Sequence, residues 1–186
     1  RGPLLAVYDI RYNHSGDLPA NIDVGVSRST DGGRTWSDVK IAIDDSKIAP
    51  SLGATRGVGD PAILVDEKTG RIWVAAIWSH RHSIWGSKSG DNSPEACGQL
   101  VLAYSDNDGL TWSRPINITE QTKNKDWRIL FNGPGNGICM KDGTLVFAAQ
   151  YWTAKGCRGP PLFIPKTGEK PGTAARASTS RRRKPR

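Results

Sequence analysis

Hydrophobic residues recur along this chain in short runs of strand length, separated by polar, glycine-rich turns. The run Ile22–Val26 alternates apolar and polar residues, which is typical of a β-strand. A short apolar run at Leu4–Tyr8 precedes it in the chain and is predicted to be a buried strand. No long amphipathic helix pattern is present, so the sequence predicts an all-β protein. The further predicted strands are Val39–Ile43, Ala62–Val65, Ile72–Trp78, Leu100–Tyr104, Ile116–Ile118, Gly137–Cys139 and Leu145–Tyr151.

Two of the turns between these runs share the motif S-x-[DN]-x-G-x-T-W, with starts 76 residues apart (105 − 29 = 76). The Asp or Asn side chain can accept hydrogen bonds from the turn, the Gly permits a positive φ, and the Trp supplies an apolar plug. A calcium loop is excluded, because Tyr104 and Pro115 stand where its first and last carboxylates belong. The motif therefore predicts structural turns, and its recurrence favours a repeat architecture. Its positions are Ser29, Asp31, Gly33, Thr35 and Trp36, then Ser105, Asn107, Gly109, Thr111 and Trp112.

The net charge of +8 comes from the end of the chain. Residues 155–186 hold ten Lys/Arg and one Glu (10 − 1 = +9), whereas residues 1–154 hold 16 basic and 17 acidic residues (16 − 17 = −1). The folded part is therefore not expected to bind nucleic acid. We divide the chain into a folded part at 1–152 and a basic tail at 153–186, which is predicted to be disordered. A nuclear-localisation or RNA-binding arm and a frameshifted or truncated gene model are alternative interpretations of the tail.

Metal and disulfide chemistry find little support in the sequence. Cys97, Cys139 and Cys157 are odd in number and lack a C-x-x-C spacing, so neither a disulfide framework nor a zinc site is predicted. His80 and His82 are interpreted as solvated loop histidines. No apolar stretch reaches membrane-spanning length. No signal peptide opens the chain, which is expected to begin inside a domain.

The turn motif resembles the Asp box of sialidases and other β-propellers. The segment Leu5–Asn13 is also similar to D-x-R-[YH]-N of bacterial exo-α-sialidases, in which an aspartate follows six residues after the arginine; here it is Asp17. The resemblance implies that Asp17 is the general acid/base and that Arg11 contacts the sugar near its 4-hydroxyl. Asp60, before Pro61, resembles the aspartate that reaches the 4-position and the amide side. From the residue types alone, both carboxylates are ordinary loop or turn aspartates.

Two tryptophans complete the resemblance at the site. Trp78 and Trp85 resemble the aromatic residues that line the N-acetyl and glycerol side of the pocket, where flat apolar walls suit the faces of a sugar. Trp73 alternates within a strand and is predicted to lie in the core. The long polar segment His80–Gly98 is predicted to be a functional or disordered loop. Gly133–Gly137 resembles the opening of the family's third blade.

The resemblance covers about residues 1–152 and implies about two and a half blades of a six-bladed propeller. The implied activity is retaining hydrolysis of terminal α-ketosidically linked sialic acids from glycoproteins, glycolipids and oligosaccharides, without metal or organic cofactor. The family implies a secreted, periplasmic or cell-surface protein. Its nucleophilic tyrosine and arginine triad are expected outside these residues, so the chain alone is expected to be inactive. A non-catalytic glycan-binding propeller and another propeller glycosidase are the alternatives.

Overall fold

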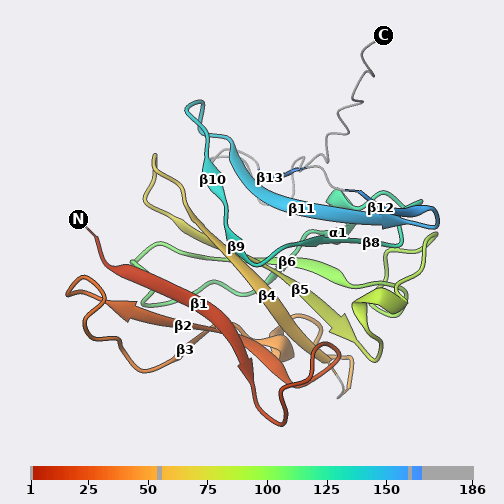
Figure 1. The fold of residues 1–186 in the computed structure, drawn as a ribbon, viewed down its shortest axis with the longest axis horizontal. Coiled ribbons are helices and arrows are strands. Elements are labelled where there is room, and N and C mark those ends of the chain that lie inside the picture. The colour runs from red at the N-terminus through yellow and green to blue at the C-terminus, as the bar shows by residue number, and fades with distance from the viewer. Residues whose placement is uncertain (1, 54–55, 159–160, 165–186) are drawn as a thin grey trace.

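The computed structural model describes residues 2–53, 56–158 and 161–164, which form three antiparallel-rich sheets (Figure 1). In the first sheet the strand order follows the chain. Its β1 and β2 pair in antiparallel register from Leu4 opposite Ser29 to Arg11 opposite Ile22. A short 3₁₀ helix, η1 (Asp45–Lys47), follows the sheet. The strands are β1 (Leu4–Arg11), β2 (Ile22–Ser29) and β3 (Lys40–Ile43).

The second sheet has the order β7-β6-β5-β4-β9, and its last strand joins β4 in parallel. The turn between β4 and β5 is closed by Asp66, whose backbone N–H donates to the Arg71 carbonyl at 2.8 Å. Residues 66–71 thus form the turn between the two predicted strands Ala62–Val65 and Ile72–Trp78. The elements of this sheet and its connections are β4 (Arg56–Val65), β5 (Ile72–His80), η2 (Ile84–Gly86), β6 (Gln99–Ser105), β7 (Ile116–Asn117), α1 (Thr119–Thr122) and β9 (Gly135–Asn136).

The third sheet is built around β11 (Leu145–Thr153), which pairs with every other strand of that sheet. A hairpin turn joins the two predicted strands Gly137–Cys139 and Leu145–Tyr151, because the Met140 N–H donates to the Thr144 carbonyl at 2.8 Å. The partner strands are β8 (Ile129–Asn132), β10 (Ile138–Cys139), β12 (Gly156–Arg158) and β13 (Pro161–Ile164).

The second sheet lies between the other two, and both of its faces are covered (Figure 1). Side chains alternate between the two faces of a strand. On β5, Val74 and Trp78 accordingly belong to one core cluster with Val24 of the first sheet. Trp73, as predicted, is core on the other face and packs in one cluster with Phe147 of the third sheet. The three sheets do not close into a ring among the described residues, and the predicted all-β propeller class is confirmed.

Several regions differ from the sequence-based expectation. His80 is buried rather than solvated, because it ends the central strand β5 and stacks on Trp78 with ring centroids 6.0 Å apart. His82 is half-buried. The segment 80–98 is folded back on itself, since the Lys88 N–H donates to the Ala96 carbonyl at 2.8 Å. Strands β8 and β9 and helix α1 were not predicted.

The expected boundary at residue 152 stays a prediction. Strands β12 and β13 follow it, and residues 165–186, most of the expected tail, lie outside the described residues. No helix in the described part of the chain is long and apolar enough to cross a membrane.

Candidate functional site

Three of the predicted site residues lie close together where β1 ends and β4 bends. The Arg11 Nη2 lies 2.8 Å from Asp9 Oδ2 and 3.6 Å from Asp17 Oδ1. Asp60 joins this group through its backbone N–H, which donates to Asp9 Oδ1 at 3.0 Å. We call Asp9, Arg11, Asp17 and Asp60 the carboxylate cluster. Asp9 and Asp60 line a hollow of about 440 Å³ that lies between β1, β4 and residues 134–136.

Asp60 is placed by a bulge in β4. Gly59 pairs with Ile77 and Ala62 pairs with Ala75, so two residues of β4 face one residue of β5. A bulge of this kind re-aims a side chain and is frequent beside active sites. Asp60 has a φ of 53°, a left-handed conformation that Asp tolerates better than most residues. Such a conformation is held only where its surroundings fix it.

Two residues that sequence reasoning did not assign fix Asp60. Asp9 accepts its N–H, as described above, and Asn132 of β8 donates from Nδ2 to the Asp60 carbonyl at 2.7 Å. Asn132 is fully buried. Asp9 belongs to the D-x-R segment that carries the resemblance, so the motif could have pointed to it. Nothing in the sequence around Asn132 marks it.

The cluster carries three carboxylates and one guanidinium. Burial raises the pKa of Asp60 above its usual value, the charges of Asp17 and Asp9 raise it further, and Arg11 opposes them. Three carboxylates offer acceptors for sugar hydroxyl and amide N–H groups. They would repel a substrate carboxylate, which must therefore point away from them.

Asp17 is carried by the loop between β1 and β2, and its side chain is 68% exposed. Arg11 holds this loop by donating from Nη1 to the carbonyls of Ser15 at 2.9 Å and Gly16 at 2.8 Å. The loop ends in Leu18 and Ala20, which are buried. Arg11 thus shapes the loop, and its predicted contact with the sugar stays a prediction.

The two predicted pocket tryptophans are not brought together. Trp78 is 0% exposed among the described residues and lies in the core between the first two sheets. Trp85 is 48% exposed. It lies edge-on to Phe131, at 5.6 Å between centroids, and beside Trp152 at 4.8 Å. An exposed aromatic surface therefore exists at Trp85 but does not include Trp78.

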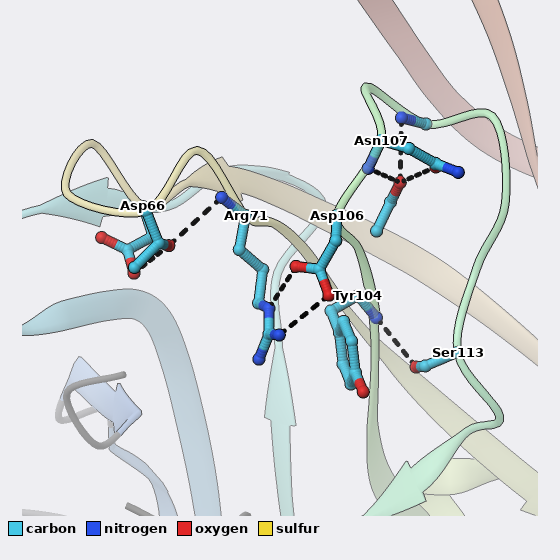
Figure 2. A network of polar contacts seen from close by, with 9 residues as sticks. Asp66, Arg71, Tyr104, Asp106, Asn107 and Ser113 are labelled. Carbon is cyan, nitrogen blue, oxygen red and sulfur yellow. Dashed lines mark hydrogen bonds and ion pairs between the residues drawn. The ribbon is translucent and has the colours of Figure 1, made fainter. Parts of the chain in front are cut away.

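Both S-x-[DN]-x-G-x-T-W motifs form compact turns. Ser29 Oγ and Ser105 Oγ each accept the N–H of their motif glycine, at 2.8 Å and 2.9 Å. Gly33 and Gly109 have φ of 91° and 77°, the positive values that the motif predicts. Figure 2 shows the second turn around Asn107 together with its neighbours Arg71 and Tyr104.

A second group of carboxylates lies at the start of β2. One oxygen from each of Asp23, Asp44 and Asp45 falls within a 4.8 Å group, a spacing that a cation could bridge. Protein donors already meet all three, and on Asp44 these are the Ser46 N–H at 3.0 Å and Lys47 Nζ at 3.1 Å. Tyr12 donates its hydroxyl to Asp23 at 2.8 Å, and Arg56 Nε lies 3.2 Å from Asp45. Burial raises the pKa of Asp45 to about 6, and the charge of Asp23 adds to this effect.

The fold and these turns define the class of protein, a β-propeller with Asp-box turns. The chain belongs to the BNR repeat-like domain family, which matches residues 1–164. It is 50% identical over 155 residues to a sialidase of Bacteroides fragilis, covering 81% of this chain and 28% of that protein. A sialidase of Paraclostridium sordellii is 34% identical, covering 80% of this chain and 36% of that protein.

The chain also superposes on solved structures of sialidases. The Hadza microbial sialidase Hz136 is 48% identical and superposes with a TM-score of 0.83, covering 90% of this chain and 34% of that one. Trypanosoma rangeli sialidase, at 20% identity and a TM-score of 0.71, covers 92% of this chain and 28% of that one and shares the fold. The chain thus spans about a third of the length of the relatives that it matches.

Proposed function

We propose that this chain supplies the acid/base and part of the sugar pocket of an exo-α-sialidase. The reaction is retaining hydrolysis of terminal α-ketosidically linked sialic acids from glycoproteins, glycolipids and oligosaccharides. The observation that carries the proposal is the carboxylate cluster, in which Asp17 is exposed and lies beside Arg11 and Asp60. The 50% identity to a sialidase supports the same assignment.

The proposed roles follow from where each group lies. Asp17, exposed at the end of its loop, protonates the departing glycosidic oxygen and later deprotonates water. Asp60 accepts hydrogen bonds from the sugar on its 4-hydroxyl and amide side, and Trp85 offers an apolar wall. Sialidases attack with a tyrosine rather than a carboxylate. The proposal assigns no residue of this chain to that step. The division into a propeller part at 1–152 and a tail at 153–186 stays a proposal, since β12 and β13 beyond residue 152 pair with β11.

The test is a chimera in which this chain replaces the aligned segment of the Bacteroides fragilis sialidase. We expect the chimera to hydrolyse α-sialosides and the isolated chain to release no fluorophore above a blank. In the chimera, Asp17→Ala lowers turnover of natural glycosides by about 10²- to 10⁴-fold. Substrates whose leaving group needs no protonation lose much less.

Asp60→Ala is the matched variant. It should raise KM on both kinds of substrate, because the lost contact is to the sugar and not to the leaving group. Equal losses on both kinds of substrate for Asp17→Ala would show that Asp17 is not the acid. Turnover by the isolated chain would show that the chemistry rests on residues present in it.

The exposed Trp85 favours one alternative, a glycan-binding module without catalysis. That module would bind sialylated oligosaccharides, and Trp85→Ala would abolish binding. A folded chimera that binds sialosides through Trp85 without turning them over would favour this alternative.

A further inference from the structure

The loop that carries Asp17 lies against the neighbouring sheet at Gly57. A Cβ built on Gly57 would lie 2.0 Å from the Ala20 carbonyl oxygen, 3.0 Å from Leu18 Cδ2 and 3.1 Å from the Ile22 nitrogen. Contacts below 3.0 Å essentially do not occur for a real Cβ, so the backbone at Ala20 would have to move by about 1 Å (3.0 − 2.0).

A glycine is needed at position 57 because the loop backbone comes so close, and not because the backbone there has a positive φ. It lies in β4 and pairs with Ser79 of β5, and its φ is not in the left-handed region. An alanine could therefore adopt the same backbone, and only the contact with the loop forbids it. Beyond that contact, Leu18 and Ala20 are buried in a cluster with Ile77 and Phe131.

β4 is held by more backbone hydrogen bonds than the loop on the other side of this contact. β4 is hydrogen-bonded along β5 on one edge and meets β9 on the other. The loop between β1 and β2 is closed by one backbone bond, from the Tyr12 N–H to the Asn21 carbonyl at 3.2 Å, and by the Arg11 contacts described above. Steric pressure at residue 57 is therefore relieved by lifting the loop away from β4.

We propose that Gly57 is a positioning residue for the general acid. Gly57 lets the loop dock against β4, the strand that also carries Asp60. The docked loop holds Asp17 beside Arg11 and Asp60. The proposal rests on the role assigned to Asp17, but its geometric part is testable without activity.

The test measures the pKa of the Asp60 carboxyl by NMR titration in the full chain. The charges that act on Asp60 are those of Asp17, Asp9 and Arg11. We expect Gly57→Ala to lower the Asp60 pKa, in the same direction as Asp17→Asn, because both remove the Asp17 charge from Asp60. The matched control is Gly53→Ala, which should leave it unchanged because a Cβ there meets nothing within 4 Å.

The double variant separates positioning from a general loosening of the fold. In the Asp17→Asn background, Gly57→Ala should add no further shift, because the charge that it displaces is already absent. An equal shift in both backgrounds, or no shift in a folded Gly57→Ala chain, would overturn the proposal. If Gly57→Ala does not fold, Leu18→Ala loosens the same contact without a clash. It should lower the Asp60 pKa by a smaller amount, and no change would also overturn the proposal.

A second arm uses the active chimera. Gly57→Ala should lower kcat on natural glycosides more than on substrates that need no protonation, with KM unchanged. A loss in KM alone would contradict a role through Asp17. An inactive wild-type chimera would count against the proposed function only, since the Asp60 titration decides the geometry by itself.

Discussion

The two Asp-box turns have the same shape but are held by different chemistry. In the first, Asp31 Oδ1 accepts the N–H groups of Arg34 and Thr35, both at 2.9 Å, and Oδ2 accepts the Thr35 hydroxyl at 2.6 Å. In the second, the neutral Asn107 accepts the Thr111 N–H at 2.9 Å and donates to the Thr111 hydroxyl at 2.8 Å. The turn therefore needs an acceptor oxygen at this position but not a negative charge.

The second turn has an external tie in place of that charge. Arg71 makes two hydrogen bonds to Asp106, at 2.6 Å and 2.9 Å, and its guanidinium lies 4.1 Å from the centre of the Tyr104 ring (Figure 2). The first turn has Thr30 at the position of Asp106. One motif is thus stabilised from within in the first turn and also from a neighbouring hairpin in the second.

The two tryptophans also differ. Trp112 is half-buried and packs against the core between the first two sheets, as its predicted role of an apolar plug requires. Trp36 is 45% exposed. It lines a hollow of about 300 Å³ together with Lys40 of β3 and with Leu110 of the second turn. The described residues leave about half of the Trp36 side chain uncovered. Trp36 therefore does not form the predicted buried plug among the described residues.

The largest effect in this comparison is expected from Asp31→Ala. It removes both carboxylate oxygens and leaves the backbone N–H groups of Arg34 and Thr35 without their partner. We expect the melting temperature to fall by about 3–6 °C. Asn107→Ala should cost about half as much, because its bonds are neutral and Arg71 still ties the turn. Equal losses in a thermal unfolding experiment would show that charge and tether are irrelevant.

The sequence predicted these turns well because their bonds are local. The bonds that close each turn join atoms within four residues of one another, so the motif contains the partners of those bonds. Most strands were also predicted, since alternation and turn residues are local signals. At the site, the motif resemblance indicated Arg11, Asp17 and Asp60, and the structure brings these three together.

The remainder depended on contacts between residues far apart in the chain. Asn132 holds Asp60 from 72 positions away, and no local pattern encodes that pairing. His80 was misjudged because its polarity suggests solvent, whereas its place at the end of β5 buries it against Trp78. Asp23 lies in an alternating strand whose polar side is buried as well, since Tyr12 and the Asp45 N–H satisfy its carboxylate.

A smaller effect should appear in the pH dependence of stability. Hydrogen bonds from Thr35, and then Ser29, lower the pKa of Asp31 from 3.8 to about 2. A lowered folded pKa means that this carboxylate stabilises the fold above about pH 4 and loses that contribution as the pH falls towards 2. Asp31→Asn should therefore be less stable than the wild type near neutral pH, and the gap should close by about pH 2.

The reciprocal change is Asn107→Asp, followed by urea unfolding at several pH values. It should stabilise the second turn above about pH 4 and have no effect near pH 2. The gain should be smaller than the Asp31 contribution, because Asp106 and Asp108 flank the new carboxylate, whereas Arg34 lies near Asp31. A gap that is independent of pH for both variants would mean that neither turn senses the charge.

The smallest effect concerns the tie from Arg71. Asp106 is 57% exposed, so solvent screens the ion pair, and the pair with its ring contact should contribute about 0.5–1 kcal/mol. A double-mutant cycle with Arg71→Ala and Asp106→Ala isolates the pair from the packing that each side chain also provides. Arg71→Lys keeps the charge but loses the two-pronged geometry and most of the ring contact, so it should recover less than half of the coupling.

Because exposed charges are screened by salt, the coupling should shrink at about 1 M NaCl. The Asp31→Ala loss should persist there, since the backbone N–H groups that it leaves unpaired are not screened. A coupling energy of zero would show that the second turn needs no external tie, and that Asn107 closes the motif by itself.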